Sequence, residues 1–273
     1  MKLTAKLILA ALVVALVILR ADEHVPAPQG IFSSPSAPST SSGMGGAVKP
    51  RDESASPPRV GEMLSYRISW ENFATAATAS ISVRGRADFY GLNVWQLEAS
   101  LNTVNPVRRL FTIDDKFQSL ADFRTLASHH YEMNLQELGK DRMQLFRPAQ
   151  DGSPPPGDGV IITVPEGTYD PLGALFALRM ANWSRPLRAH VFDGKQIYEM
   201  AAERGGDEAV TVPAGRFKAN RINVQLQPDT GKAPPLALTI WLTLDDSRVP
   251  IAIEAALPFG SLRAQLTSAT SSR

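Results

Sequence analysis

Runs of residues that alternate between apolar and polar side chains constrain the fold of this chain more than any other feature. In LSYRISW, at 64–70, every second residue is apolar and the residues between them are polar. Successive side chains of a β-strand point to opposite faces, so this alternation is typical of an antiparallel strand with one wet face. Similar or more apolar runs predict further strands at 77–84, 93–101, 111–119, 127–137, 141–147, 159–164, 187–192, 196–203, 208–212, 216–227, 236–244, 249–257 and 261–267.

The stretch TYDPLGALFALRMANW follows a different pattern. Asp170 is a good N-cap, and Pro171 suits the first position of a helix because its φ is already near the helical value. Apolar side chains then recur at helical spacing, which predicts one principal helix at about 171–182. This helix should pack on a sheet or plug one end of a barrel. A shorter helical turn is expected at 106–110, and a two-residue hairpin turn at Asp193-Gly194.

The N-terminus carries an export pattern. Lys2 and Lys6 precede an unbroken apolar run of 13 residues at 7–19. A basic start followed by a short apolar run is typical of a secretory signal peptide. The run would span only about 20 Å as a helix, short of the roughly 30 Å core of a bilayer. We therefore expect residues 1–21 to be a signal peptide, or an N-terminal anchor in the inner membrane if they stay uncleaved. Both alternatives place the rest of the chain in the periplasm.

Residues 22–58 have the composition of a linker, with eight Ser, seven Pro and four Gly. Such a stretch buries too little apolar surface to offset the loss of chain entropy, so we expect it to be disordered. The remaining residues, 59–270, show no internal repeat and no second boundary. The sequence thus predicts a single β-rich domain behind a spacer.

Composition excludes several classes of protein. The chain has no cysteine, which rules out disulfides, zinc-thiolate sites, a cysteine nucleophile and a lipid-modified cysteine. The formal net charge is only +1, which gives no electrostatic reason to expect nucleic acid as a partner. No catalytic or nucleotide-binding motif is present. We therefore expect no catalytic residue and no cofactor, and the protein is not expected to be an enzyme.

The most informative acidic residue lies in FTIDDKFQS. Asp114 and Asp115 are neighbours on a predicted strand, so they point to opposite faces, and Asp115 shares its phase with the apolar side chains. A buried carboxyl group must be hydrogen-bonded or paired. A hairpin centred at 122–124 would place Asp115 opposite His129 or Tyr131, one of which should satisfy it. The group is either a polar pair in the core or a polar spot that orients a ligand inside a cavity.

Trp241 completes the candidate ligand-binding residues, which are Asp115, His129, Tyr131 and Trp241. The strand that carries Trp241 is apolar in its other phase as well, so we expect the helix or a ligand to cover both of its faces. A metal site is not expected: His130, Glu132 and Asn134 share one strand face, but no other histidine-rich segment supports them.

Residues 245–248, DDSR, offer two carboxylates, a hydroxyl and a guanidinium. They could form an active site, but alternating apolar residues run up to them and continue after them. Asp and Ser side chains hydrogen-bond local backbone in turns. The segment is therefore interpreted as the bend between two strands.

Six stretches in order resemble an exported bacterial family catalogued as domain of unknown function 3108. They are GEMLSYRISWENFATAATASISV, LFTIDDKFQSLAD, VPEGTYDPLGALFALR, VFDGKQIYEM, VTVPAGRFKANRINV and TIWLTLDDSRVPIAIEAALPFGSLRAQL. The resemblance covers about 60–267 and implies an antiparallel spiral β-roll or open barrel, similar to periplasmic lipoprotein carriers that hold acyl chains. It implies no established catalytic residues.

The expected function is a non-enzymatic periplasmic binding or scaffold protein with an apolar cavity for a lipid, an acyl group or a lipoprotein ligand. Two alternatives remain open: a tethered module that binds an envelope protein partner, and an envelope hydrolase.

Overall fold

The computed structural model describes residues 57–71, 73–137, 139–149, 159–229, 235–257 and 260–270. The predicted signal peptide or anchor and nearly all of the predicted linker lie outside the described residues. Among the described residues, no helix reaches the length and apolar character that crossing a membrane requires.

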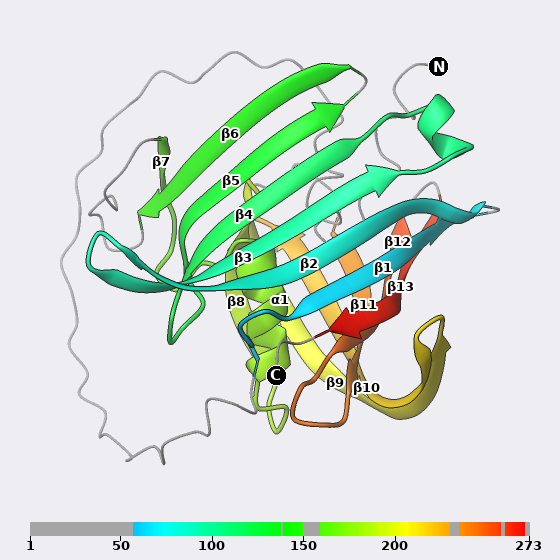
Figure 1. The fold of residues 1–273 in the computed structure, drawn as a ribbon. Helices are drawn as coiled ribbons and strands as arrows, with labels where there is room; N and C mark the ends of the chain where they lie inside the picture. Colours follow the sequence, from blue (N-terminus) through cyan, green and yellow to red (C-terminus); the bar gives the residue numbers. More distant parts are fainter. Residues whose placement is uncertain are drawn as a thin grey trace.

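The described residues form a sheet of thirteen strands, with one α-helix packed inside its curve (Figure 1). The helix is α1, Pro171–Met180. The strands are β1 Met63–Trp70, β2 Phe73–Phe89, β3 Leu92–Thr103, β4 Asp114–Asp122, β5 Ser128–Glu137, β6 Lys140–Ala149, β7 Val160–Thr163, β8 Leu187–Phe192, β9 Ile197–Val212, β10 Gly215–Pro228, β11 Leu236–Thr243, β12 Pro250–Leu257 and β13 Gly260–Thr270. A 3₁₀ turn, Val107–Arg109, stands where a helical turn was expected.

The order of the strands makes the sheet a spiral. It runs β7-β6-β5-β4-β3-β2-β1-β13-β12-β11-β10-β9-β8, so the first and last strands pair at its centre. The chain moves outward from β1 to β7, passes through α1, and returns from β8 at the other edge. Figure 1 shows β1 to β7 on one side of α1 and β8 to β13 on the other. Neighbouring strands are antiparallel except β6 and β7, which confirms the predicted open β-roll with one principal helix.

Within the described residues, the two ends of the sheet approach each other without pairing, with β6, the neighbour of edge strand β7, near the other edge strand, β8. Phe146 of β6 and Phe192 of β8 meet edge to face, with ring centroids 5.2 Å apart. The segment that leads into α1 also joins the edge at β8. The N–H of Tyr169 donates to the carbonyl of His190, and the carbonyl of Tyr169 accepts from the N–H of Phe192. Side chains and this connecting segment therefore close one part of the roll.

The predicted alternation accounts for the core. On β1, Leu64, Tyr66 and Ile68 are buried, while the residues between them are partly exposed. On the remaining strands too, apolar side chains that point inward fill the interior. The tip of the β9–β10 hairpin bends back onto the sheet, where the N–H of Ala214 donates to the carbonyl of Leu266.

Three local predictions differ from the structure. The expected strands 196–203 and 208–212 form one strand, β9, because a bulge opposite Arg221 and Ile222 absorbs the glycine pair 205–206. The hairpin after β8 has a four-residue loop, since Phe192 pairs with Ile197. In that loop, the side chain of Asp193 accepts the N–H groups of residues 195 and 196. The helix ends at Met180, two residues earlier than expected.

Candidate functional site

The interior of the roll is the first candidate site, and α1 occupies it. Every residue of α1 from Pro171 to Arg179 is buried. A helix on a protein surface needs only one apolar stripe, whereas a helix surrounded by a sheet must be apolar nearly all round. The helix is apolar in this way except at Arg179, a charged residue near its end that is also fully buried.

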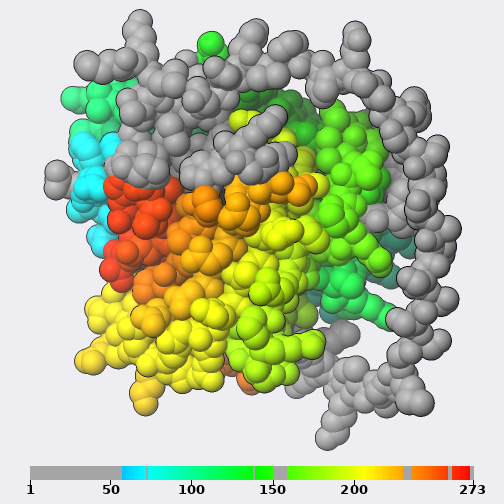
Figure 2. All heavy atoms as spheres, turned by 180° about the vertical axis from the view of Figure 1, so that it is seen from behind, coloured from blue at the N-terminus to red at the C-terminus, as the bar shows by residue number. Residues whose placement is uncertain are grey.

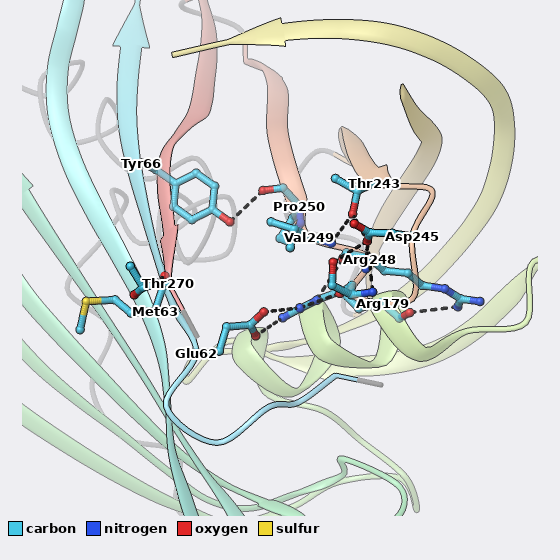
Figure 3. A network of polar contacts seen from close by, with 11 residues as sticks. Glu62, Met63, Tyr66, Arg179, Thr243, Asp245, Arg248, Val249, Pro250 and Thr270 are labelled. Carbon is cyan, nitrogen blue, oxygen red and sulfur yellow. Dashed lines mark hydrogen bonds and ion pairs between the residues drawn. The ribbon is translucent and has the colours of Figure 1, made fainter. Parts of the chain in front are cut away.

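Arg179 is the centre of a polar network at the C-terminal end of α1 (Figure 3). Its guanidinium donates to both carboxylate oxygens of Glu62, each at 2.7 Å. Its other donors reach the carbonyls of Ser247 at 2.8 Å and Arg248 at 3.1 Å. A planar guanidinium matches a carboxylate with two parallel hydrogen bonds. The network therefore joins α1 to the residue before β1 and to the bend between β11 and β12.

The bend at 245–248 is shaped by Asp245, which confirms its interpretation as a connection between strands. The carboxylate of Asp245 accepts the N–H groups of Ser247 and Arg248 and the hydroxyl of Thr243. Burial alone would raise the pKa of Asp245, but the hydrogen bonds from Ser247, Thr243 and the backbone outweigh it and lower that pKa. The acidic group that could have been catalytic is thus engaged in holding the turn.

The same bend docks the helix. Arg248 has a positive φ of 43°, and its guanidinium donates to the carbonyls of Arg179 at 3.0 Å and Ala181 at 2.6 Å. The last carbonyls of a helix lack partners within the helix, and a cation there is favoured by the helix dipole. Arg248 therefore caps α1, while the backbone of the bend accepts from Arg179.

Tyr66 adds a further link beside this network. Its hydroxyl donates to the carbonyl of Pro250 at 2.8 Å, which joins β1 to the start of β12. Burial raises the pKa of Tyr66, with the charge of Arg179 acting in the opposite direction. The phenol therefore stays neutral and acts as a donor.

Asp170 anchors the other end of α1. It is fully buried and accepts the N–H groups of Leu172 and Gly173, both at 2.9 Å, as the predicted N-cap. It also accepts the hydroxyl of Ser119 on β4 at 2.5 Å. Burial raises the pKa of Asp170 even though these hydrogen bonds favour its charged form. A Cβ on Gly173 would lie 2.6 Å from the carbonyl oxygen of Leu126, so α1 packs tightly against the β4–β5 loop.

On its opposite side, α1 leaves an apolar cavity of about 40 Å³ against β8 to β12. The lining residues are Pro171, Ala174, Leu175, Leu178, Val191, Met200, Val224, Leu226, Leu238, Ile240 and Ile253. All of these side chains are apolar. The volume is well below the roughly 300–1,000 Å³ of pockets that enclose a whole small ligand.

Asp115 is buried, as predicted, with 2% of its surface exposed. Its carboxylate accepts the N–H of Gln136 at 2.9 Å. The predicted register was wrong, because Tyr131 pairs with Ser119 rather than lying opposite Asp115. The β4–β5 hairpin is centred later than expected, since Asp122 accepts two backbone N–H groups and stabilises a longer loop.

The other three candidate ligand-binding residues occupy different places. Tyr131 is fully buried in the core, and His129 lies beside a bulge, its Nε2 3.6 Å from a carboxylate oxygen of Asp122. Trp241 lies on the outer face of β11, where its indole N–H donates to Glu208 at 2.6 Å. The helix does not cover Trp241 as expected, because Glu208 and the guanidinium of Arg263 lie against its ring on the outer face. The structure does not bring the four residues together.

His130, Glu132 and Asn134, the residues of β5 considered for a metal site, contact one another. The side chain of Asn134 donates to Glu132 at 2.7 Å, and Nε2 of His130 lies 3.9 Å from the same carboxylate. Burial lowers the pKa of His130, with Glu132 acting in the opposite direction. No group of three or more potential metal-ligating side chains occurs within the described ranges.

The sequence did not single out Glu62 or Arg179, and it gave Arg248 a place in a bend but no role in capping the helix. Arg179 offered one signal, a charged residue within an apolar helix that a sheet was expected to cover. Its partner Glu62 lies 117 residues away, and no local pattern connects the two.

An open antiparallel sheet curled around an internal helix defines the class of barrel-like β proteins. Within that class, residues 65–267 match the family described as Protein of unknown function (DUF3108), so the chain belongs to that family. No curated protein matches the sequence.

Three solved structures are similar. A β-barrel-like protein of the DUF1849 family from Brucella abortus has a TM-score of 0.51 at 10% identity, covering 77% of this chain and 97% of its own. A candidate lipoprotein from Parabacteroides distasonis has a TM-score of 0.39 at 8% identity, covering 79% and 98%. A candidate exported protein with a YmcC-like fold from Bacteroides fragilis has a TM-score of 0.37 at 12% identity, covering 79% and 98%. The Brucella protein shares the fold.

Proposed function

We propose that this is an exported, non-enzymatic protein of the bacterial cell envelope that binds an acyl group between α1 and the strands β8 to β12. The N-terminal signal or anchor pattern supports export to the periplasm. The apolar cavity beside α1 is the observation that carries the proposal, since its whole lining suits a hydrocarbon chain.

The cavity of about 40 Å³ holds only a small part of an acyl chain, so binding requires α1 to move away from β8 to β12. The packing of α1 is compatible with unequal movement. Its first turn is fixed against the loop at Leu126, where Gly173 leaves no room for a Cβ. Its C-terminal end is held at the bend between β11 and β12 by Arg179 and Arg248. The movement therefore opens the middle of α1, where apolar side chains meet the facing strands. An acyl chain that replaced the contacts between α1 and the strands would keep their apolar side chains out of water.

The carboxyl groups around α1 support a non-enzymatic role. Glu62 is paired with Arg179, Asp170 caps the helix, and Asp245 holds the bend. Each of these groups is engaged in hydrogen bonds that maintain the fold.

Native mass spectrometry of the protein purified from a bacterial periplasm tests the proposal. We expect mass increments of a fatty acid or phospholipid on the native protein. Ala174→Leu, which adds volume to the cavity, should lower the lipid-bound fraction. Ala237→Leu is the matched control, because Ala237 is exposed on the outer face of β11, and it should retain the lipid.

A protein that carries no lipid, and from which solvent extracts none, would refute acyl binding. If the same preparation retains one stoichiometric envelope protein, the tethered interaction module becomes the better account. Thermal unfolding of both variants would verify that they fold, since adding volume to a packed core costs about 1–3 kcal/mol.

A further inference from the structure

A second hollow lies outside the roll, between the segment 166–169 and the outer face of β8, β9 and β10. Its volume is about 570 Å³, within the range typical of small-ligand pockets. Figure 2 looks onto this half of the molecule, where the yellow and orange atoms of β9 to β12 face the viewer. The lining residues are Glu166, Gly167, Tyr169, Arg188, Ala189, His190, Glu199, Met200, Ala201, Gln225 and Gln227. We call this hollow the outer groove.

The register of the strands gives the outer groove its shape. Two rows of three residues cross β8, β9 and β10: His190, Glu199 and Gln227 form one row, and Arg188, Ala201 and Gln225 form the next. Ala201 is the central residue of its row and has a side chain of one carbon. The longer side chains of Arg188 and Gln225 stand on either side of it, so the groove is deepest at Ala201. The segment 166–169 forms a third wall.

The polar side chains of the outer groove are not engaged with the protein. Within the described residues, no hydrogen bond or ion pair joins the side chains of Glu166, Tyr169, Arg188, His190, Glu199, Gln225 or Gln227 to another group. Other polar residues on the outer face are paired, such as Arg84 with Glu98 and Trp241 with Glu208. Among these groups, the guanidinium only donates hydrogen bonds, the carboxylates only accept them, and the amides do both.

This combination narrows the class of ligand. Two carboxylates face one guanidinium, so the outer groove has no excess of positive charge to select phosphate groups. Polar and charged side chains stand on every wall between its apolar residues, so it lacks the continuous apolar lining that an acyl chain requires. The edge of β8 beside it is already bridged by the backbone of Tyr169, which opposes the addition of a peptide strand. Sugar hydroxyls both donate and accept hydrogen bonds, as these side chains require.

We propose that the outer groove binds an uncharged oligosaccharide. The amides of Gln225 and Gln227 and the carboxylate of Glu199 bind its hydroxyl groups across neighbouring strands. The small side chain of Ala201 leaves room for the oligosaccharide at the bottom of the groove. This site shares only Met200 with the cavity beside α1, lies on the other face of the sheet, and does not depend on acyl binding.

Calorimetric titration of the full-length protein with maltotetraose, cellotetraose and chitotetraose tests this proposal. We expect the wild type to bind at least one of the three. Ala201→Trp fills the floor and should weaken that binding by about tenfold or more, which corresponds to about 1.4 kcal/mol. Ala209→Trp is the control, since Ala209 is exposed further along β9 and does not line the outer groove, and it should bind like the wild type.

Failure of all three sugars to bind would overturn the proposal, and so would equal binding by Ala201→Trp and the wild type. A mixed-charge peptide and inorganic phosphate serve as comparison ligands in the same titration. If either binds in the sugars' place and is lost in Ala201→Trp, the groove is a site but the assigned ligand class is wrong. Thermal unfolding of both variants would check that each one folds.

Discussion

Replacing Glu62 by Ala should destabilise the protein strongly, because it leaves the charge of Arg179 buried without its counter-ion. Arg179 is 0% exposed and Glu62 is 4% exposed, and the substitution removes two hydrogen bonds of 2.7 Å. The carbonyls of Ser247 and Arg248 remain as acceptors, but neither carries a full charge.

The magnitude follows from the general cost of breaking a buried ion pair. Removing one partner of such a pair costs about 3–5 kcal/mol. For a domain of this size, each kcal/mol lowers the melting temperature by about 2–4 °C, so Glu62→Ala should lower it by about 6–20 °C. Replacing both residues, as in Glu62→Ala with Arg179→Met, should cost less than the sum of the single changes, because no unpaired charge is left behind.

Urea unfolding of the purified protein, followed by tryptophan fluorescence, measures these free energies. Arg84→Ala is the matched control, since it also breaks an Arg–Glu pair, but one in which the Arg84 side chain is 60% exposed. It should cost under about 1 kcal/mol. If Glu62→Ala costs no more than Arg84→Ala, the network does not hold α1 in place as argued.

Three further changes test other parts of the helix and its supports. Gly173→Ala should destabilise the protein by about 1–3 kcal/mol despite the better helix propensity of alanine, because the added Cβ would lie 2.6 Å from the carbonyl oxygen of Leu126. A neutral or stabilising result in chemical unfolding would refute the close packing. Arg248→Ala should cost about 1–3 kcal/mol through loss of the cap on α1, whereas Arg109→Ala, at an exposed arginine, should stay within about 0.5 kcal/mol. Because burial raises the pKa of Asp170 above its usual 3.8, its contribution to stability is full below that value and is lost as the pH rises through the raised one. Asp170→Asn keeps an N-cap acceptor, so the fall in melting temperature as the pH rises above about 4 should be smaller than in the wild type. An unchanged pH profile would contradict this assignment.

The strands and the helix could be predicted because their signals are local. Alternation in LSYRISW becomes the buried phase of β1, and Asp170 followed by Pro171 becomes the N-cap and first turn of α1. The bend at 245–248 could be predicted for the same reason, since Asp245 bonds only to groups within three residues of itself.

The polar contacts between distant segments could not be predicted. The pair of Arg179 with Glu62 depends on where the spiral brings α1 relative to β1, which no periodicity encodes. The contact of Trp241 with Glu208 could not be predicted because Glu208 comes from β9, two strands away in the sheet. The register at Asp115 was missed because the side chain of Asp122 sets the loop length of the β4–β5 hairpin.

Photo-crosslinking shows directly whether an acyl chain binds between α1 and the strands β8 to β12. Palmitate carrying a diazirine on its chain would be added to the purified protein, and the labelled peptides would be mapped after irradiation. We expect labels on the cavity lining, at Leu175 or Leu178 of α1 and at Val224, Leu238 or Ile240 of the facing strands. Labels confined to the outer surface, or labelling that unlabelled palmitate does not reduce, would contradict it.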